Sequence, residues 1–476
     1  MNWLLKKRMN KKNHKILLID PRSVRHGPPQ IIKSQDTALT SVYSKALDNK
    51  VGDRMHFTPK QNSNAVNNRY VSSYGLLMLG SDLKRRGFRV DYINGDYYHD
   101  SSDFLTAIIQ KSEDCKMLCF TGTTPQYREI EKIAEQLLEL YPDKLLSFGG
   151  PHSYFFKNHY ESNPFHIIFI GHNITRCGEK IEDILYNEVH MAGCSIHMAN
   201  GYNDVTKDFS LIPTKYLKDT LLYSYISFGC PNNCRYCVEH YFTNKVCFLS
   251  LQDKFKEIEF LVNRADVKSV HLADSDFLIN STFASEFLSV LERKELKCCF
   301  TINTSPAVIC RAGTISLIKR FANLGLIELL IGVEYLSDEQ LNRMNKKYHI
   351  ADFYEAILKI RTAVPDLIIS FYSLIGLPGE TSKTIKENLL WTSKFKKSGL
   401  FDFSFPKFFV PYPGTDVYEN PEKHSVIILH NRFEEYHRWS LPRPISVIGM
   451  SDDSFIDELV ELYSIGGTII NEYKSY

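Results

Sequence analysis

The chain has 476 residues, of which 43% are hydrophobic and 24% charged, and its formal net charge at pH 7 is +2. This length allows two or three domains with sizeable cores, and so small a net charge excludes an overall field that attracts nucleic acid. No run approaches the roughly 18 apolar residues that a spanning helix needs, and residues 1–20 lack the apolar core of a signal peptide. We therefore expect a cytoplasmic protein with no membrane or nucleic-acid partner.

Short apolar runs alternate with amphipathic helical stretches along most of the chain, as is typical of parallel sheets built from strand–helix–strand units. In the first part, a helix over 74–87 ends at Gly87, a suitable C-cap, and another covers about 130–141. Residues 30–68 are polar and unpatterned, which indicates a long loop. An open, doubly wound, Rossmann-like sheet is predicted over residues 1–212, with ligands beyond the carboxyl ends of its strands. Those strands are Lys15–Asp20 (closed by Pro21), Phe88–Ile93, Lys116–Gly122, Lys144–His152 with its loop, and Phe165–Gly171.

A second series of strand and helix patterns follows. Its helical stretches include 251–265, 282–294 and 382–398, and its apolar runs are Leu221–Ser227, Ser269–Ala273, Lys297–Ile302, Ile327–Val333, Leu367–Ile375 and Phe403–Val410. Six consecutive units predict a partial (β/α)6 barrel over residues 213–415, with its site at the carboxyl ends of the strands. We expect residues 416–476 to form a small helical extension that covers the barrel mouth and contacts the substrate.

Polar or glycine-rich residues follow every strand of the predicted barrel. The first strand leads into a cysteine-rich loop, and the others are followed by Asp274–Phe277, Asn303–Pro306, Glu334, Gly376–Glu380 and Pro411–Thr415. Because the carboxyl ends of parallel strands lie at one rim of a barrel, we expect these residues to gather in a single site.

The cysteine-rich loop, GCPNNCRYC, contains Cys230, Cys234 and Cys237. The chain has eleven cysteines, and an odd number in a large chain argues against a disulfide framework. Structural zinc takes four ligands; His240 would complete that set, although zinc knuckles usually open with a C-x2-C pair. A four-iron cluster also takes four thiolates, so three cysteines leave one iron open. An open metal position is what catalysis requires.

The spacing C-x3-C-x2-C, with Tyr236 before the last cysteine, resembles the signature of the radical S-adenosylmethionine (radical SAM) enzymes. The segments IGVEYLSDEQLNRMNK and SLIGLPGET look like that family's fourth-strand and fifth-strand segments. The resemblance implies that Cys230, Cys234 and Cys237 ligate a four-iron four-sulfur (4Fe-4S) cluster whose open iron binds S-adenosylmethionine (SAM). Reductive cleavage of SAM would then release a 5′-deoxyadenosyl radical. The implied SAM contacts are Tyr236, Asn303, Ser305, Glu334 and Gly376. From the residues alone, Glu334 is equally an ion-paired strand-end carboxylate, and Asn303 a turn residue.

A doubly wound domain ahead of such a barrel resembles the cobalamin-dependent branch of the family. That branch has a threonine-containing turn and, one strand–helix unit later, a Gly-Gly turn; here these are Thr121, Thr123, Gly149 and Gly150. Such turns would let the cofactor tail pass between strand ends, so we expect Gly150→Val to block binding. Alternatively, the glycines only make tight turns. The sequence lacks the D-x-H-x-x-G motif that supplies a histidine ligand to cobalt in many cobalamin enzymes. Of the G-E-G-E motif that usually follows the last strand of this domain, only Gly178–Glu179 remains. The loop histidines His26 and His152 are not taken as cobalt ligands.

The resemblance implies a radical SAM enzyme, most directly one that carries out cobalamin-dependent methyl transfer to an unactivated carbon of a small molecule or peptide. The alternatives are a radical rearrangement, cyclisation or dehydrogenation with cobalamin absent or non-methylating and, outside enzymes, a zinc-stabilised interaction module. Methylthio transfer is disfavoured, because the four cysteines of residues 1–212 do not resemble the second three-cysteine set that it needs. The implied partners are the substrate and an electron donor such as flavodoxin or ferredoxin.

Overall fold

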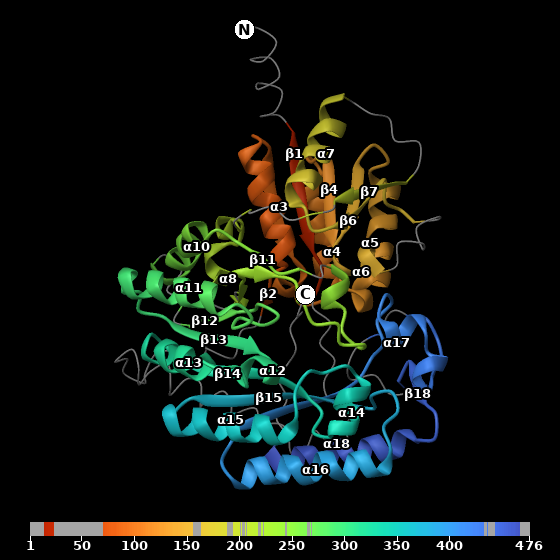
Figure 1. The fold of residues 1–476 in the computed structure, drawn as a ribbon. Helices are drawn as coiled ribbons and strands as arrows, with labels where there is room; N and C mark the ends of the chain where they lie inside the picture. Colours follow the sequence, from red (N-terminus) through yellow and green to blue (C-terminus); the bar gives the residue numbers. More distant parts are fainter. Residues whose placement is uncertain are drawn as a thin grey trace. The chain divides into compact units, whose positions relative to one another are not determined.

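The computed structural model of the chain divides into two compact units, each built on a six-stranded parallel sheet (Figure 1). The first unit comprises Met1–Arg25, Asn68–Leu221 and Glu472–Tyr476, and the second comprises His26–Asn67 and Leu222–Asn471. The structure describes residues 14–22, 70–155, 163–187, 194–199, 201, 205, 207–217, 220–221, 223–242, 245–263, 267, 269–432, 436 and 443–466.

The sheet of the first unit is parallel throughout and has the strand order β3-β1-β4-β5-β6-β7. After β1 the chain adds β3 on one side of this strand and then β4 to β7 on the other side. The switch point of a doubly wound fold therefore lies between β1 and β4. The predicted Rossmann-like sheet is therefore confirmed. Its strands are β1 (Lys15–Asp20), β3 (Arg89–Asn94), β4 (Met117–Thr121), β5 (Leu145–Gly149), β6 (Ile167–Gly171) and β7 (Ser195–Ala199).

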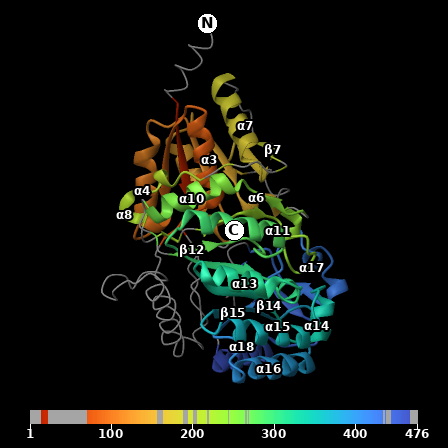
Figure 2. The ribbon, with the colours of Figure 1, turned by 60° about the vertical axis from the view of Figure 1, so that its left-hand side comes forward.

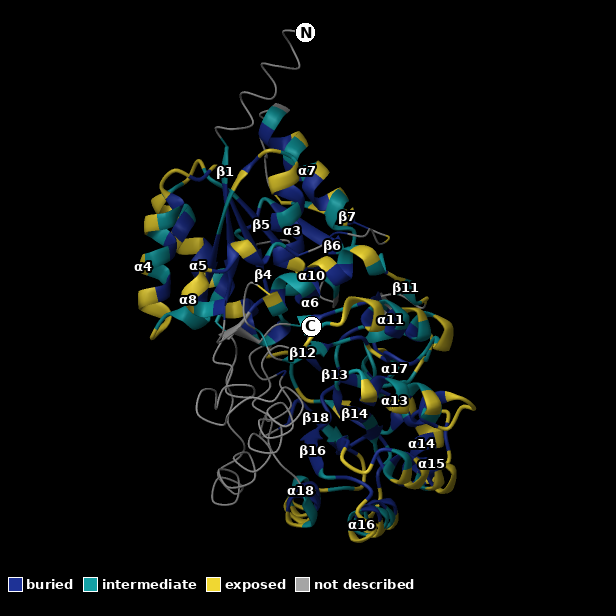
Figure 3. Ribbon diagram, turned by 90° about the vertical axis from the view of Figure 1, so that its left-hand side faces the viewer, coloured by how far each residue is buried: buried dark blue, intermediate teal, exposed yellow. Residues whose placement is uncertain are grey.

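Helices lie on both sides of this sheet. In Figure 3, α4 (Ser101–Ser112) and α5 (Tyr127–Leu140) lie on one side of the strands, and α7 (Ile174–Asn187) lies on the other. Helix α3 (Tyr74–Arg85) packs against α7. Gly178 permits this packing, because a Cβ atom there would lie 2.0 Å from Asp82 Oδ2. The glycine retained from the G-E-G-E pattern therefore has a role in helix packing.

The sheet of the second unit is also parallel, and its strands follow one another in chain order. This arrangement confirms the predicted six-stranded partial barrel. The strands are β9 (Tyr223–Ser224), β12 (Ser269–Leu272), β13 (Cys299–Thr304), β14 (Leu326–Glu334), β15 (Ile368–Ile375) and β16 (Phe403–Phe408).

The prediction of one barrel strand over 221–227 is wrong in extent. Only β9 joins the large sheet, whereas β8 (Thr220–Leu221) pairs with β2 (Tyr70–Val71), and β10 (Ser227–Phe228) pairs with β11 (Cys247–Phe248). The physical reason is Asp274, whose buried carboxylate accepts hydrogen bonds from the N–H groups of Ile226 and Ser227 at 3.2 and 2.6 Å. These bonds turn the chain out of the sheet just before the cysteine loop.

A layer of helices covers the outer face of the barrel (Figure 2). Phe300 of β13 contacts Phe321 of this layer, and Phe371 of β15 contacts Phe395, with ring centroids 5.5 and 5.6 Å apart. Since side chains alternate along a strand, the neighbouring residues Thr301 and Tyr372 face the inside of the barrel. The layer consists of α10 (Leu251–Asn263), α11 (Ser281–Lys294), α13 (Thr314–Asn323), α15 (Ile350–Ala363) and α16 (Ser382–Lys397).

The C-terminal segment forms α17 (Asp416–Glu419), an antiparallel pair of strands, β17 (Val426–Ile428) and β18 (Ile445–Val447), and α18 (Asp452–Gly466). Helix α18 packs against α16 and β16 within the second unit. The domain boundaries at 212/213 and 415/416 stay predictions. The predicted loop over 30–68 and most of the predicted mouth-covering loop (433–435 and 437–442) lie outside the described residues. Within the described ranges, no helix has the length and apolar character that a bilayer crossing demands.

Candidate functional site

The three cysteines of the predicted metal site are half-buried in the loop between β10 and α9 (Glu239–Phe242). Burial raises the pKa of the Cys230 thiol to about 11, so a bound metal cation is needed to hold it as a thiolate near neutral pH. A four-iron cluster takes one thiolate on each iron, so three cysteines would hold three of its irons and leave the fourth open.

The cysteine loop rests on the turn that follows α14 (Asp338–Arg343). The N–H of Arg235 donates to the Met344 carbonyl oxygen at 3.2 Å, and the side-chain amide of Asn345 donates to the Asn233 carbonyl oxygen at 3.0 Å. Two segments that are more than 100 residues apart in the sequence are thereby joined at the barrel rim. This turn brings Lys346 to the site.

Glu334, the last residue of β14, has a φ of +66°, a left-handed conformation that is costly for a residue with a side chain. A β-bulge between Gly332 and Glu334 interrupts the pairing with β15 at this point. The Glu334 carboxylate lies 3.6 Å from the ammonium group of Lys346, which also donates to the Gly332 carbonyl oxygen at 2.8 Å. Backbone strain of this kind is concentrated at functional sites.

Lys346 links Glu334 electrostatically to the cysteine loop. Its Nζ atom lies 5.9 Å from the centroid of the Tyr236 ring. Burial by itself would lower the pKa of Lys346, but the negative charges of Glu334 and the three cysteines outweigh burial and raise it. A cation is therefore held charged beside a carboxylate and three potential thiolates. Sequence reasoning missed Lys346, whose only signal is that it closes the segment IGVEYLSDEQLNRMNK.

Asn303 and Ser305, at the end of β13, lie beside two buried aspartates. The Ser305 hydroxyl donates to Asp276 at 2.5 Å, and the Asn303 amide donates to the Asp274 carbonyl oxygen at 3.2 Å. Burial raises the pKa of Asp276 to about 6, and its charge contributes to the raised pKa of Cys230. Both predicted residues are thus near the cysteine loop, with their side chains already hydrogen-bonded inside the protein. Asp276, which fixes Ser305, had no predicted role.

Gly376 follows β15 directly and has a φ of +74°. Its N–H donates to the Glu380 carboxylate at 3.0 Å, and its carbonyl oxygen accepts a hydrogen bond from Arg443 at 3.3 Å. The two residues that flank Gly376 belong to the buried apolar cluster against which Tyr236 packs. The residues that flank Gly376 and the Tyr236 ring therefore contribute to the same apolar cluster, although the Gly376 N–H is already used within the protein.

In the first unit, the four predicted cofactor residues meet at the carboxyl ends of β4 and β5. Thr121 lies opposite Gly149 in the parallel ladder. Thr123 begins the short helix η2 (Thr124–Gln126), and its N–H and hydroxyl donate to the Gln126 side chain at 2.9 and 2.8 Å. Gly150 has a φ of +97° and packs next to Thr121. The grouping predicted from the sequence is therefore present in the fold.

The two glycines differ in what a side chain would meet. A Cβ atom at Gly150 would lie 2.6 Å from Thr121 Oγ1 and 3.1 Å from the Gly122 backbone. Gly150→Val would thus disrupt the protein itself, so the expected loss of cofactor binding in this variant would not report on the cofactor alone. At Gly149, a Cβ atom would make only an ordinary contact of 3.6 Å with Phe169. The packing of the protein itself therefore does not require a glycine at position 149.

The predicted loop position of His152 is wrong, because this residue lies in the short helix α6 (Pro151–Phe155) and is fully buried. Its ring stacks on Tyr127 with centroids 4.0 Å apart, and its Nδ1 atom lies 3.4 Å from the Thr124 hydroxyl. His152 is therefore part of the packing behind the glycine turn. His26 lies outside the described residues.

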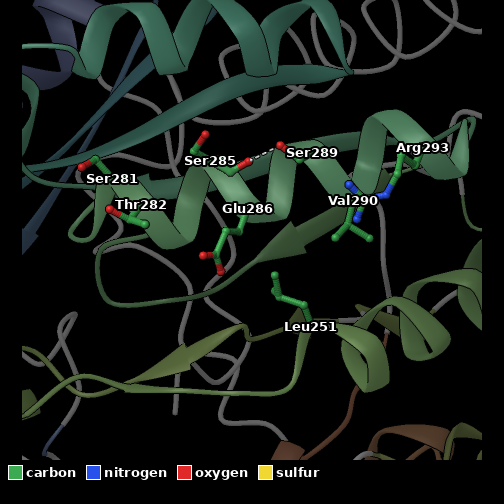
Figure 4. A pocket seen from close by; sticks show the side chains of 8 residues that line it. All are labelled: Leu251, Ser281, Thr282, Ser285, Glu286, Ser289, Val290 and Arg293. Carbon is green, nitrogen blue, oxygen red and sulfur yellow. Dashed lines mark hydrogen bonds between the residues drawn. The ribbon is translucent and has the colours of Figure 1, made fainter.

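A surface pocket runs along helix α11 on the outside of the barrel (Figure 4). Its lining contains none of the predicted site residues; it consists of Leu251, Ser281, Thr282, Ser285, Glu286, Ser289, Val290 and Arg293. Arg320 of α13 donates to the hydroxyls of Ser285 and Ser289, in each case at 2.9 Å. These serines therefore tie two helices together, and we assign no ligand to the pocket.

Comparison with protein families identifies the barrel. Residues 224–392 match the model of the Radical SAM superfamily. The tRNA-2-methylthio-N(6)-dimethylallyladenosine synthase of Ectopseudomonas mendocina is 27% identical over 232 residues, which are 44% of this chain and 48% of that protein. The anaerobic magnesium-protoporphyrin IX monomethyl ester cyclase of Rubrivivax gelatinosus is 27% identical over 191 residues, 40% of this chain and 33% of that protein. The chain thus spans about half the length of these relatives or less.

Two solved structures are similar over nearly the whole chain. TsrM from Kitasatospora setae, a radical SAM methyltransferase solved with cobalamin and a [4Fe-4S] cluster bound, has a TM-score of 0.64 at 13% identity, over 95% of this chain and 91% of that one. OxsB, a cobalamin-dependent SAM radical enzyme solved with aqua-cobalamin and SAM bound, has a TM-score of 0.61 at 14% identity, over 98% of this chain and 63% of that one. At such identities the likeness concerns the fold. The three-cysteine loop lies within the segment that matches the Radical SAM superfamily model, and the fold of the chain is similar to the folds of TsrM and OxsB.

Proposed function

We propose that this protein cleaves SAM reductively at a 4Fe-4S cluster held by Cys230, Cys234 and Cys237. With cobalamin bound to its first unit, it would transfer a methyl group to an unactivated carbon of a small molecule or peptide. The observation that carries the proposal is the three-cysteine loop, which rests on the turn bearing Lys346, beside the strained Glu334. The superfamily match of the same segment supports it.

The rim offers the groups that a SAM molecule requires. The cluster, when bound, supplies the electron that breaks the sulfonium bond of SAM. The Lys346 ammonium suits the methionyl carboxylate, and the Glu334 carboxylate suits the methionyl amino group or a ribose hydroxyl. Burial raises the pKa of Tyr236 well above its ordinary value, so this ring stays neutral and presents an apolar face to adenine. The burial of these groups would shield the reacting atoms from water.

Cobalamin, when bound, would supply the methyl carrier. Its proposed contacts are Thr121, Thr123, Gly149 and Gly150, at the carboxyl edge where ligands of doubly wound sheets bind. Gly149 fits this role because the packing of the protein does not itself demand a glycine there. The fold shared with TsrM and OxsB, both solved with cobalamin bound, supports the proposal. Because His152 is buried against Tyr127, we propose that the cobalt has no histidine ligand from this helix.

Methylthio transfer is the second candidate, because the curated relatives include tRNA methylthio synthases. That reaction calls for a second set of cluster ligands in the first unit. Cys115, Cys119 and Cys177 are buried there, and burial raises their pKa values to about 11, about 12 and about 12. Cys119 lies within β4 and Cys177 within α7, so these buried cysteines do not share one loop as Cys230, Cys234 and Cys237 do, which favours methyl transfer over methylthio transfer.

Labelled SAM distinguishes these reactions. Anaerobically reconstituted protein would be incubated with hydroxocobalamin, a reductant such as reduced flavodoxin, a metabolite extract and SAM that carries a trideuterated methyl group. We expect products whose mass increases by one labelled methyl group attached to carbon. A labelled methylthio group would favour the second candidate. Unlabelled products formed together with 5′-deoxyadenosine would favour a rearrangement, cyclisation or dehydrogenation, and zinc in place of iron would favour an interaction module.

A further inference from the structure

Residues Gly376–Glu380 connect β15 to α16 and form a tightly held turn. We call this turn the adenine loop, because the resemblance to radical SAM enzymes implies that this segment lies along the adenine of SAM. Gly376 and Gly379 both have a φ of +74°, which favours glycine. The Glu380 carboxylate, 2% exposed, accepts the N–H groups of Gly376 and Leu377 at 3.0 and 2.9 Å. Gln340 of α14 donates to the Pro378 carbonyl oxygen at 2.9 Å. The carboxylate of the loop's own Glu380 and the side chain of Gln340 on α14 therefore fix most of this loop.

A third contact reaches the adenine loop from the C-terminal segment. Arg443, which lies just before β18, is 1% exposed and donates from Nη1 to the Gly376 carbonyl oxygen at 3.3 Å. Its Nε and Nη2 atoms donate to Asp452 at 3.1 and 2.8 Å, and its guanidinium carbon lies 4.4 Å from the centroid of the Phe455 ring. Asp452 and Phe455 both belong to α18.

The fit between Arg443 and Gly376 leaves no spare room. A Cβ atom on Gly376 would lie 2.0 Å from Nη1 of Arg443, so the guanidinium fills the space that a side chain would occupy. A buried guanidinium is costly unless it is paired and hydrogen-bonded, and here Asp452 and the Gly376 carbonyl oxygen satisfy it. Removing Arg443 would leave the Gly376 carbonyl oxygen without its charged donor, and the turn would lose the side chain that packs against it.

We infer that Arg443 is a positioning residue for SAM. Through its hydrogen bond to Gly376 it fixes the adenine loop, so that the C-terminal segment completes a site whose other proposed residues lie in the barrel. The inference rests on the proposed function, because it takes the adenine loop to contact the adenine of SAM.

Two ligands separate an effect on the adenine loop from general damage. S-methylmethionine carries the amino, carboxylate and sulfonium groups of SAM but lacks the adenosine. The dissociation constants of both ligands would be measured by calorimetry on the anaerobically reconstituted full chain and on Arg443→Met. The matched control is Arg320→Met, which removes an arginine that pairs with Glu292 on the outside of the barrel.

We expect Arg443→Met to raise the dissociation constant of SAM roughly tenfold, as the loss of one hydrogen bond from a charged donor predicts. The constant for S-methylmethionine should change less than about twofold, iron content should stay the same, and Arg320→Met should match wild type. Unchanged SAM affinity, or equal weakening of both ligands, would overturn the inference.

If Arg443→Met fails to fold, the dissociation constants of SAM and S-methylmethionine would be measured on Asp452→Ala instead. This variant removes the half-exposed partner of Arg443 and keeps the guanidinium. The proposed function fails in a different way. Wild-type protein would then hold no iron cluster and bind neither ligand, whatever residue occupied position 443.

Discussion

Glu334 is held in a conformation that costs an L-residue about 1–2 kcal/mol. The surrounding structure imposes it: a β-bulge precedes the residue, and the Tyr348 hydroxyl donates to the carbonyl oxygens of Val333 and Tyr335 at 2.9 and 3.3 Å. These contacts fix both flanking residues, so Glu334 cannot relax into the strand. The result is a carboxylate that faces Lys346 beside the cysteine loop.

Glu334→Gln tests whether this carboxylate binds SAM. The substitution keeps the backbone and the size of the side chain but removes the charge. We expect the dissociation constant of SAM to rise about tenfold, with an unchanged iron content, because the cluster ligands are intact. Glu339→Gln is the control, since Glu339 is an exposed carboxylate on α14 that pairs with Lys383. Wild-type SAM affinity in Glu334→Gln would reduce Glu334 to a structural strand-end residue.

Gly149→Val and Gly150→Val test the proposed cobalamin contact as a pair. Gly149→Val should leave the stability of the first unit within about 1 kcal/mol of wild type, since a Cβ atom at this position makes only ordinary contacts. It should nevertheless prevent hydroxocobalamin from co-eluting with the protein in gel filtration. Gly150→Val should lower the stability by roughly 2–4 kcal/mol even without cofactor, because it adds backbone strain to a clash. Normal cobalamin binding by Gly149→Val would contradict the proposed contact.

At the scale of elements, α18 docks on the barrel through a buried acidic residue. Glu458 is 1% exposed and accepts a hydrogen bond from the Asn388 amide of α16 at 2.8 Å. Burial raises the pKa of Glu458 to about 7. Burial also raises the pKa of Glu380 well above its ordinary value, and the charge of Glu458 adds to this. The helix is therefore attached most firmly when Glu458 is protonated.

This attachment predicts a pH-dependent stability. Glu458 releases its proton near pH 4.5 in the unfolded chain and near pH 7 in the folded one. Between these values the folded state binds more protons, so the free energy of unfolding falls as the pH rises. At pH 8, Glu458→Gln should be more stable than wild type by on the order of 2–3 kcal/mol, and the difference should vanish near pH 4.5.

The measurement is urea unfolding of wild type, Glu458→Gln and Glu461→Gln at several pH values. Glu461 lies on the same helix but is exposed, so its substitution should leave the pH dependence unchanged. A wild-type free energy of unfolding that does not fall between pH 5 and pH 7 would disprove the assignment of a raised pKa to Glu458.

The sequence predicts correctly those helices and strands whose local pattern of apolar and polar residues is enough to form them. Within β1, Ile16–Ile19 is a continuous apolar run, as expected of a strand buried on both faces in a parallel sheet. The run Leu221–Ser227 looks similar but does not form one continuous strand, because the carboxylate of Asp274, 47 residues away, accepts a hydrogen bond from the Ser227 N–H. At the site, the cysteine spacing is local and predictable. The approach of Lys346 to the cysteine loop and of Arg443 to Gly376 depends on tertiary contacts that no local pattern encodes.

At the scale of the whole molecule, the proposed cofactor residues are divided between two units. The cluster and SAM residues belong to the second unit, and the cobalamin residues belong to the first. Because each unit has its own sheet and core, the two binding functions should be separable. We expect the Cys230→Ala, Cys234→Ala, Cys237→Ala triple variant to lose iron but to retain hydroxocobalamin in gel filtration. Loss of the corrin together with the iron would show that the sites depend on each other.

The central claim is that the three-cysteine loop holds the cluster at which SAM is cleaved. The direct test is to quantify iron, sulfide and 5′-deoxyadenosine in anaerobically reconstituted, reduced protein, for wild type and for the triple cysteine variant. We expect about four irons per wild-type chain, formation of 5′-deoxyadenosine from SAM, and the loss of both in the variant. Undiminished SAM cleavage by the variant, or stoichiometric zinc in place of iron, would contradict it.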